Sequence, residues 1–540
     1  MITILFLLAF NSTLFITGKV TPELARVLDQ NPASAKISVI VHMGEQYPDL
    51  STTNKPVSER ARILKQIAAT SQAPLITYLS QCDDKVSDIK RFWIFNGFHM
   101  KATARVIEEL AGRDDVWFIS PDAAIQLPAD EKTSGSGAVE AIEWNILKVM
   151  ADSCWVAGFT GDSVLIGHLD TGVDFTHPAL AGKFSGWWRD FINGLPDPYD
   201  DQGHGTYVAG VLCGGDGLGP FTDDIGVAPG AQLVVAKIFD AGGGGSYEDI
   251  DSGMQWLADL KADSGVNIRA VTNSWGTMTA TELHWWTFCA AWKSLEMLPV
   301  FAVGGYGPGA GTAGVPANYP LCLGVGSTDN SDNIASFSSR GPAPDMDPWN
   351  DMLNWYRPDW NLIKPDISAP GINIRTCGPG GGYLVLSGTS FSTPHVAGAA
   401  AILCEVNPAI SITHLYNCLL DNADHPSQGA PYPNNNYGWG RLNVWNAFQA
   451  INSIQEKPAA VADTRGTVLV YPSPARSELF IKAPATSRIT GIYSAGGFLI
   501  KDIRTRRDRI RLDGLPAGIY FLKFENEQDR AVFKKITVIK

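Results

Sequence analysis

Hydrophobic and polar positions divide the 540-residue chain into three patterned stretches, and two polar segments separate them. The first stretch, residues 20–127, mixes apolar runs of strand length with amphipathic runs of helix length. Strands are predicted at Lys36–Met43, Phe92–Ala102 and Asp115–Ser120, and helices at Ser58–Leu79, which Pro74 should end or kink, and at Ala104–Ala111. Because this order approaches a split βαβ pattern, a small α+β domain is expected here.

The second stretch, about residues 139–451, alternates short apolar strands with helical runs. Strands are predicted at Ser163–Leu169, Gln232–Phe239, Ile268–Asn273, Leu298–Val303 and Leu321–Val325, and helices at Tyr247–Ala258 and Ser392–Glu405. Such alternation favours a mostly parallel sheet with helices on both faces. The fold class predicted for the largest part of the chain is therefore α/β.

The third stretch follows the charged segment Gln455–Arg465 and alternates apolar with polar residues at period two. Seven short strands are predicted, at Thr467–Tyr471, Leu479–Lys482, Ile489–Tyr493, Phe498–Asp502, Arg509–Leu512, Ile519–Phe524 and Phe533–Ile539. Their spacing indicates a small β-sandwich. The other polar segment, Pro128–Ala138, is rich in Gly and Ser, and we expect it to be an exposed connector that proteases can reach.

Charge is unevenly distributed over these stretches. The chain carries a formal charge of -13, yet from Asp463 onward 15 Lys and Arg stand against 8 Asp and Glu, so the part before Asp463 holds about -20. An acidic body argues against a nucleic-acid enzyme, which needs a basic face to neutralise phosphates. It could favour cationic substrates, although simple solubility explains it as well.

The N-terminus contains an apolar run, Ile2–Phe10, that is too short to span a bilayer but suits the apolar region of a secretory signal. It lacks the usual Lys or Arg before that run. No later segment has the length and apolarity of a membrane helix, so export without a membrane span is expected. The eight cysteines show no zinc-ribbon or redox spacing, and neither disulfide pairs nor metal ligands are assigned.

Three short segments carry residues with the potential for covalent catalysis: Leu169–Val173, Gly203–Thr206 and Gly388–Gly398. Asp170 ends an apolar strand, and the carboxyl ends of parallel strands gather ligands. His204 stands between two glycines before an apolar run, while Ser390 lies where a turn enters a helix, whose first N–H groups favour an oxyanion. A serine needs a base to become a good nucleophile, and a carboxylate can orient that base.

Each of these residues also has an ordinary structural explanation. A single Asp after a strand is usually a turn residue, a single His a core or surface residue, and a single Ser before a helix an N-cap. Together, in the order Asp170, His204, Ser390, the segments resemble the subtilisin-like serine proteases, the subtilases. The resemblance covers residues 144–442 and includes Gly226–Gly230 (GVAPG) and Ser336–Pro342 (SFSSRGP).

The resemblance implies a subtilisin-like fold in which Asp170, His204 and Ser390 form a catalytic triad. It also implies that substrate lies extended between two edges of the sheet, one at Ser274, Trp275 and Gly276 and one at Gly243 and Gly244. Trp275 would be either a pocket wall or a packing residue. The stretch Ala343–Leu362, which contains Trp349, Trp355, Tyr356 and Trp360, would be either a rim of the substrate site or a surface flap.

One position departs from the family pattern. Subtilases usually present an asparagine side chain as the second oxyanion donor, beside the backbone N–H of the serine, but the matching segment Ala302–Gly309 (AVGGYGPG) has Gly305 there. Loss of that donor lowers turnover in subtilisin by about 10²–10³. Three alternatives follow: a slow enzyme, another donor such as Tyr306 or Asn273, or a weakly active homologue.

The flanking stretches carry resemblances of their own. Residues 19–135 resemble a subtilase propeptide, ferredoxin-like in fold. The resemblance implies that this segment assists folding and inhibits the peptidase until the protein cuts its own chain, which we expect between Leu127 and Ala141. Residues 467–540 are similar to a type IX secretion C-terminal sorting domain through Val470–Ala475 (VYPSPA), Leu515–Leu522 (LPAGIYFL) and Lys534–Lys540 (KKITVIK). The predicted division is a signal at 1–18, a propeptide at 19–135, a peptidase at 139–452, a linker at 453–466 and the sorting domain at 467–540.

The sequence thus predicts a secreted serine endopeptidase that hydrolyses extended polypeptides. Its expected partners are polypeptide substrates, its own propeptide and the type IX secretion machinery, with no nucleic acid, and its expected place is outside a diderm bacterium or on its surface. No cofactor is expected, and structural calcium, common among subtilases, is not assigned to residues. The rival hypothesis is a secreted binding or surface protein that keeps the fold without useful activity.

Overall fold

The computed structural model describes residues 18–128 except 46, 48, 49, 52 and 54, residues 131–133, and residues 142–455 except 358. Of the C-terminal segment it describes 469–471, 478–482, 488–494, 499–505, 509–512, 514–516, 518–525 and 531–538. The chain forms two compact units, Met1–Asn452 and Ser453–Lys540. The predicted signal at 1–18 lies outside the described residues except for Gly18, and the predicted linker lies outside them except for 453–455. The predicted domain limits remain predictions.

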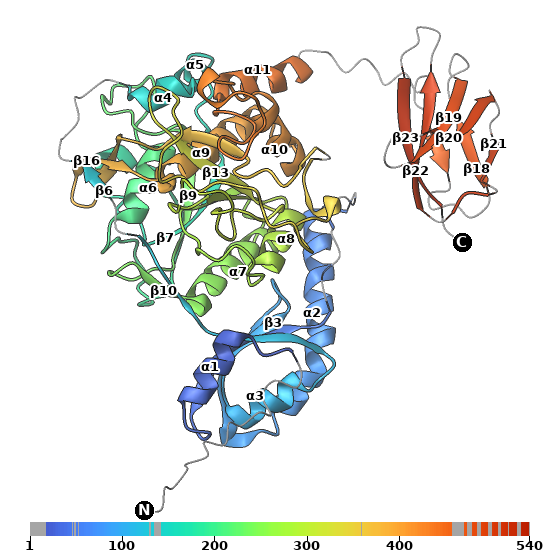
Figure 1. The fold of residues 1–540 in the computed structure, drawn as a ribbon. Helices are drawn as coiled ribbons and strands as arrows, with labels where there is room; N and C mark the ends of the chain where they lie inside the picture. Colours follow the sequence, from blue (N-terminus) through green and yellow to red (C-terminus); the bar gives the residue numbers. More distant parts are fainter. Residues whose placement is uncertain are drawn as a thin grey trace, which may run out of the picture. The chain divides into compact units, whose positions relative to one another are not determined.

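The first part of the larger unit is an α+β domain with the expected ferredoxin-like topology (Figure 1). Its antiparallel sheet has the order β2-β3-β1-β4, and its elements are α1 (Pro22–Gln30), β1 (Lys36–Met43), α2 (Val57–Leu79), β2 (Val86–Phe92), β3 (Gly97–Thr103), α3 (Ala104–Ala111) and β4 (Val116–Pro121). Pro74 lies inside α2, which continues through it.

The single strand predicted at Phe92–Ala102 is wrong, because the chain turns between β2 and β3. Asn96 adopts a left-handed conformation with φ of 51° in that turn. Trp93 and Phe95 look like strand residues because they are apolar, but they contact the second domain instead. The backbone N–H of Trp93 donates to the Gln255 side chain at 2.8 Å, and Phe95 stacks on Phe288.

The centre of the larger unit is a parallel seven-stranded sheet with the order β14-β13-β12-β11-β7-β9-β8. The strands are β7 (Leu165–Asp170), β8 (Phe184–Asp190), β9 (Gln232–Lys237), β11 (Ile268–Asn273), β12 (Leu298–Ala302), β13 (Leu323–Thr328) and β14 (Ile367–Pro370). β8 and β14 were not among the predicted strands. They are the two edge strands, where the apolar run that signals a buried strand is shortest or broken.

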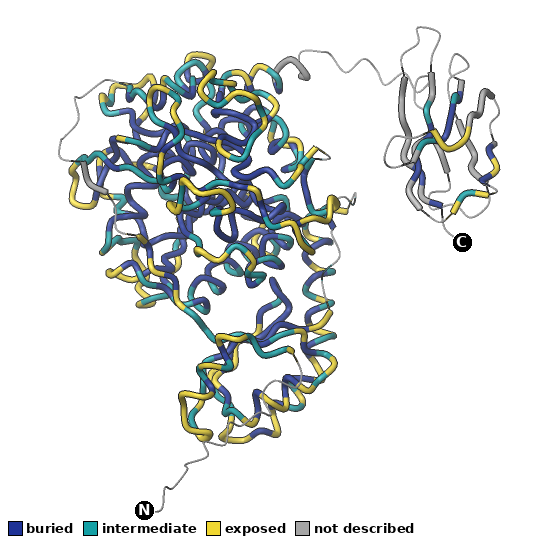
Figure 2. The backbone as a smooth tube through the Cα atoms, viewed as in Figure 1, coloured by how far each residue is buried: buried dark blue, intermediate teal, exposed yellow. Residues whose placement is uncertain are grey.

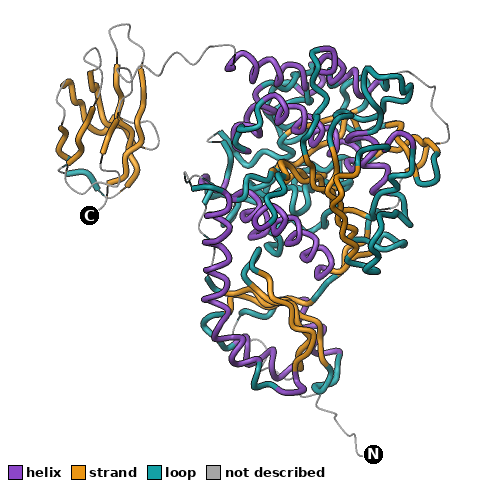
Figure 3. Tube along the Cα trace, turned by 180° about the vertical axis from the view of Figure 1, so that it is seen from behind, coloured by secondary structure: helices purple, strands orange, loops and turns teal. Residues whose placement is uncertain are grey.

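Helices cover both faces of this sheet, as predicted (Figure 3). Leu233 and Val235 of β9 belong to a hydrophobic core shared with α6 (His204–Cys213) and α9 (Thr389–Val406). The alternate residues Val234 and Ala236 belong to a second core shared with α7 (Tyr247–Asp263) and α8 (Trp286–Ser294). This alternation follows from the two-residue period of a strand. Both cores are visible as the densely buried interior in Figure 2.

Shorter elements complete the larger unit. They are β5 (Ala124–Gln126), β6 (Glu131–Thr133), α4 (Trp144–Lys148), α5 (Ala151–Val156), β10 (Gly244–Ser246), β15 (Ile374–Gly378), β16 (Gly382–Ser387), α10 (Ile412–Asp421) and α11 (Val444–Gln455), with 3₁₀ turns at Asp83–Lys85, Pro178–Leu180, Met352–Asn354 and Ser427–Gly429. Among the described residues, no helix is both long enough and apolar enough to cross a membrane. All eight cysteines are free thiols, and seven of them are buried.

The stretch Ala343–Leu362 is anchored in the core. Trp349 is fully buried against Trp286 and Tyr319, and its indole N–H donates to Asn318 at 3.0 Å. The described aromatic residues of this stretch therefore act mainly as packing residues, which fits neither the rim nor the flap.

The smaller unit contains the seven strands that the alternating pattern predicts, arranged in two sheets. One sheet has the order β17-β18-β21 (Leu469–Tyr471, Glu478–Lys482, Arg509–Arg511), and the other β20-β19-β22-β23 (Leu499–Thr505, Arg488–Ser494, Gly518–Glu525, Ala531–Val538). Ile510 of the first sheet shares one core with Ile492, Leu522 and Ile536 of the second. The packing of two sheets around this core is the predicted β-sandwich.

Candidate active site

The described site begins with a buried carboxylate–imidazole pair. Asp170 is the last residue of β7, and His204 is the first residue of α6, whose N-cap Gly203 has a φ of 115° that favours glycine. His204 Nδ1 lies 2.7 Å from Asp170 Oδ1, and both side chains are 1% exposed. The backbone N–H of Thr171 donates to the same oxygen at 2.8 Å. The carboxylate therefore fixes the orientation of the imidazole ring.

Electrostatics keep this carboxyl group ionised. Burial alone raises the pKa of Asp170, but the charge of His204 and its hydrogen bond outweigh burial, so the pKa lies below the usual 3.8. An ionised Asp170 stabilises a positive charge on His204. Glycine is required next to the histidine, because a Cβ on Gly205 would lie 2.1 Å from the carbonyl oxygen of Gly172.

Ser390 lies in the first turn of α9, which begins three residues earlier than the predicted Ser392. The N-terminal N–H groups of a helix have no partners within the helix, so this turn presents donors around Ser390. Ser390 Oγ lies 3.4 Å from the carbonyl oxygen of Ser274, and Ser274 Oγ donates to the Ser390 carbonyl at 2.8 Å. The ring of the adjacent Phe391 lies 6.3 Å from that of His204, so the fold brings all three predicted residues to one place.

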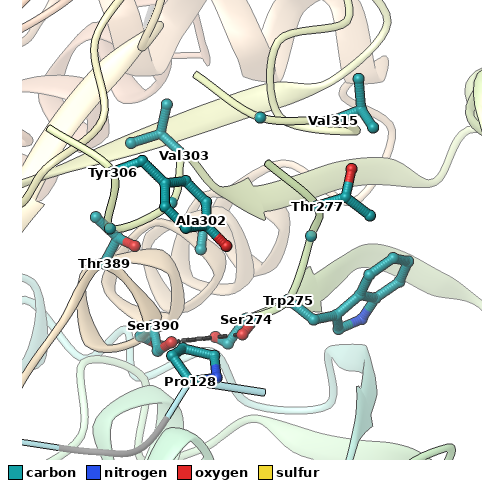
Figure 4. A pocket seen from close by; sticks show the side chains of 14 residues that line it. Pro128, Ser274, Trp275, Thr277, Ala302, Val303, Tyr306, Val315, Thr389 and Ser390 are labelled. Atoms are coloured by element: carbon teal, nitrogen blue, oxygen red, sulfur yellow. Dashed lines mark hydrogen bonds between the residues drawn. The ribbon is translucent and has the colours of Figure 1, made fainter. Parts of the chain in front are cut away.

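A pocket opens beside Ser390 (Figure 4). Its cavity is about 50 Å³ and its walls include Ser274, Trp275 and Gly276, as the sequence predicts. Trp275 is only 3% exposed and packs against Trp285 and Phe301, so it serves both as a wall and as a packing residue. The sequence did not reveal Thr277 and Val315, which also line the pocket, because apolar and small residues in loops carry no pattern of their own.

Gly305 and Tyr306 lie on the same pocket wall. A Cβ on Gly305 would meet no atom within 4 Å, and its φ lies outside the left-handed region, so the position has room for a side chain. Asn273 is not available as a substitute donor, because its amide donates to the carbonyl groups of Val271 and Val300. The Tyr306 side chain projects into the pocket in Figure 4.

The other predicted edge, Gly243–Gly244, is occupied by the chain itself. β5 pairs antiparallel with β10, placing Gln126 opposite Gly244, and the Leu127 N–H donates to the Gly243 carbonyl at 2.9 Å. Pro128 then lines the pocket that holds Ser390. Three residues later β6 pairs antiparallel with β16, with Glu131 opposite Ser387. The connector is thus anchored by backbone pairing on both sides of Ser390.

His395 is fully buried in α9, one and a half turns after Ser390. Its Nδ1 lies 2.7 Å from the Phe391 carbonyl oxygen and its Nε2 2.9 Å from the Asn145 amide. Burial lowers the pKa of His395 from 6.5 to about 4. These contacts suit a packing residue of the helix that carries Ser390.

This burial predicts an acid sensitivity. The folded protein keeps His395 neutral down to about pH 4, whereas the unfolded chain binds a proton near pH 6.5. Its contribution is complete above pH 6.5 and is lost as pH falls toward 4, by about 3 kcal/mol. Urea denaturation between pH 7 and 4 should therefore show a shallower decline in His395→Gln than in the parent, and equal slopes would contradict this assignment.

Comparison with known proteins places the whole arrangement in a family. Residues 161–440 match the model of the subtilase family, 38–128 that of the peptidase inhibitor I9, and 469–540 that of a secretion system C-terminal sorting domain. Subtilisin Savinase of Lederbergia lenta is 33% identical over 306 residues, which are 56% of this chain and 98% of that protein. An alkaline protease of Shouchella clausii is 29% identical over 79% of this chain and 97% of its own length.

Bacillopeptidase F of Bacillus subtilis strain 168 is 30% identical over 74% of this chain, but the match spans only 29% of that protein. The fold and these matches define a serine protease of the α/β class with an inhibitory propeptide. The chain belongs to the subtilase family. It also carries an I9-type inhibitor domain and a secretion sorting domain, so the resemblances drawn from the sequence are confirmed.

Proposed function

We propose that this protein is a secreted serine endopeptidase that cleaves extended polypeptides through an acyl-enzyme, with Ser390 as the nucleophile. His204 takes the proton of Ser390 as Ser390 Oγ attacks the carbonyl carbon of the substrate. The electrons of the C=O double bond then move to the substrate carbonyl oxygen. The collapse of this intermediate breaks the C–N bond, and His204 returns the proton to the leaving amine. Water then releases the acyl group by the same steps in reverse.

The buried Asp170–His204 pair supports this proposal most directly. The two side chains are 2.7 Å apart, and the His204 ring lies 6.3 Å from the ring of Phe391, the residue after Ser390 in α9. A fluorophosphonate probe tests it directly, since the probe reacts only with an activated serine. We expect the processed protein to be labelled on one residue, which mass spectrometry identifies as Ser390. Absence of labelling in folded, processed protein would instead support a binding protein without catalytic activity.

Substrate binding follows from the contacts of the chain's own connector. A polypeptide that replaces β5 would pair with Gly243 and Gly244 and place a side chain in the pocket bounded by Ser274, Trp275 and Gly276. We assign no side-chain preference. The sorting domain supports export by the type IX machinery of a diderm bacterium and a place outside the cell or on its surface. Structural calcium stays a prediction without assigned residues.

The backbone pairing of the connector predicts where the protein cuts its own chain. Pairing holds the chain at Leu127 on one side of Ser390 and at Glu131 on the other. One of the three peptide bonds between Pro128 and Glu131 should therefore be cut, which narrows the interval 127–141. N-terminal sequencing of the processed protein should find Ala129, Asp130 or Glu131 first. A mature N-terminus after Thr133, or any such cut in Ser390→Ala made without other proteases, would contradict self-processing at this point.

A further inference from the structure

The interface between propeptide and peptidase contains a cluster of potential metal ligands. One ring nitrogen of His99 and one carboxylate oxygen each of Asp122 and Glu248 all lie within 4.8 Å of one another. His99 is on β3 of the propeptide and Asp122 follows β4, while Glu248 is in the first turn of α7 in the peptidase. The three ligands therefore come from both domains.

His99 belongs to a buried network in which Asp251 also contacts His284 and accepts from the Trp285 indole N–H, and one ring nitrogen of His99 is left over. The side chain is 0% exposed, and its Nε2 lies 2.8 Å from Oδ2 of Asp251. Its Nδ1 is buried and has no hydrogen-bond partner among the described residues. A buried polar atom without a partner destabilises the fold through its lost hydration, and a bound cation would remove that cost. An imidazole held by a carboxylate through one nitrogen is the usual arrangement of a metal-binding histidine, with Asp251 as the orienting group.

We propose that His99, Asp122 and Glu248 bind a divalent transition-metal cation, Zn²⁺ or one of similar chemistry, that bridges propeptide and peptidase. A nitrogen donor with two carboxylates suits such a cation better than Ca²⁺ or Mg²⁺, which prefer all-oxygen sets. Ligand atoms around tetrahedral Zn²⁺ lie about 3.3 Å apart, so side-chain rotations that shorten the spacing by about 1.5 Å complete the site. Water can take the fourth position.

The present partners of the Asp122 and Glu248 carboxylates leave room for a cation to bind. Lys90 contacts Glu248 but is 56% exposed, and exposed ion pairs contribute little, so a cation can displace it. Asp122 accepts from the Ser38 hydroxyl at 3.2 Å and from the Glu248 N–H at 3.2 Å, which leaves further lone pairs for a metal. The consequence is regulatory. The cation raises the affinity of the propeptide for the peptidase, and removal of the cation favours release of the propeptide.

The test uses the full-length Ser390→Ala protein, which keeps the propeptide attached, so that the outcome does not depend on catalysis. Isothermal titration with ZnCl₂ should find one site per chain. Glu248→Gln and His99→Gln should each weaken that site at least tenfold. The matched control is Asp259→Asn, also on α7 and at the same interface through Trp93 and Lys65, and it should bind Zn²⁺ as tightly as the parent.

No binding by the parent, or equal affinity in Glu248→Gln, would overturn the proposal even if His99→Gln failed to fold. In the active protein, a zinc-selective chelator in excess Ca²⁺ should speed dissociation of the cleaved propeptide about tenfold, and Glu248→Gln should show the fast rate without chelator. Identical rates with and without chelator would also count against the bridge. A failure of hydrolysis itself leaves the Zn²⁺ titration unaffected, so the two proposals fail separately.

Discussion

Replacing Ser390 by alanine is expected to abolish peptide hydrolysis and self-processing, with turnover falling by about 10⁶. Under the proposed function the loss is that large because the Ser390 oxygen forms the bond to the substrate and acts as a unit with its partners. The corresponding loss known for subtilisin is about 2 × 10⁶. Turnover of a chromogenic peptide, together with the mass of the purified chain, measures both effects.

The matched control for this variant is Ser392→Ala. Ser392 is also in the first turns of α9 and is fully buried, but its hydroxyl has no partner among the described residues. Removing that hydroxyl should leave turnover within a few-fold of the parent. If Ser390→Ala retained substantial hydrolysis, or if both variants lost it equally, Ser390 would not be the nucleophile.

Introducing asparagine at Gly305 is expected to raise turnover by about 10²–10³. Under the proposed function the backbone N–H groups at the start of α9 supply one side of the oxyanion site, and a second donor contributes about 2.7–4 kcal/mol in subtilisin. A Cβ at Gly305 meets no atom within 4 Å, so the backbone there has room for the first atom of the new side chain. The gain should appear in kcat, since the oxyanion exists only in the transition state and intermediate.

Gly305→Ala is the control for that gain. It adds the Cβ but no donor, so its turnover should stay at the parent level. A rise in Gly305→Ala would indicate a packing effect. An unchanged rate in Gly305→Asn would mean that another donor already serves the oxyanion, and Tyr306, on the same wall, is then the residue to replace by phenylalanine.

The sequence predicted the elements that are buried by their own domain better than those buried by another. The strands Lys36–Met43 and Ile268–Asn273 and the helix Ala104–Ala111 have the predicted limits, because the strand or helix pattern of each runs over its whole length. Trp93 and Phe95 misled the prediction because their apolar side chains pack in one core with residues of α7 and α8 rather than in a strand of their own domain. The edge strands β8 and β14 escaped notice because β8 is mostly half-buried or exposed and β14 is only four residues long, so neither carries a long apolar run.

The candidate site shows the same division. The sequence predicted Asp170, His204 and Ser390 as candidates because each sits at the end of a regular element with a glycine within two residues. Pro128 and Val315 were not, because their place in the pocket depends on how distant loops meet. The cluster of His99, Asp122 and Glu248 was equally hidden, since Glu248 is 126 residues or more from the other two and lies across an interface from them.

The double anchoring of the connector across Ser390 has a consequence for the timing of activation. Under the proposed function, the first bond that the protein meets is delivered by its own backbone at an effective concentration that no external substrate can match. The first cleavage is then a first-order event, and its half-time does not change on dilution. Its amino-side product is still paired with β10 and joined to a folded domain, so it leaves slowly. Under the proposed function, the amino-side product is therefore expected to stay on the peptidase after the bond is cut, and its departure is a separate step of maturation.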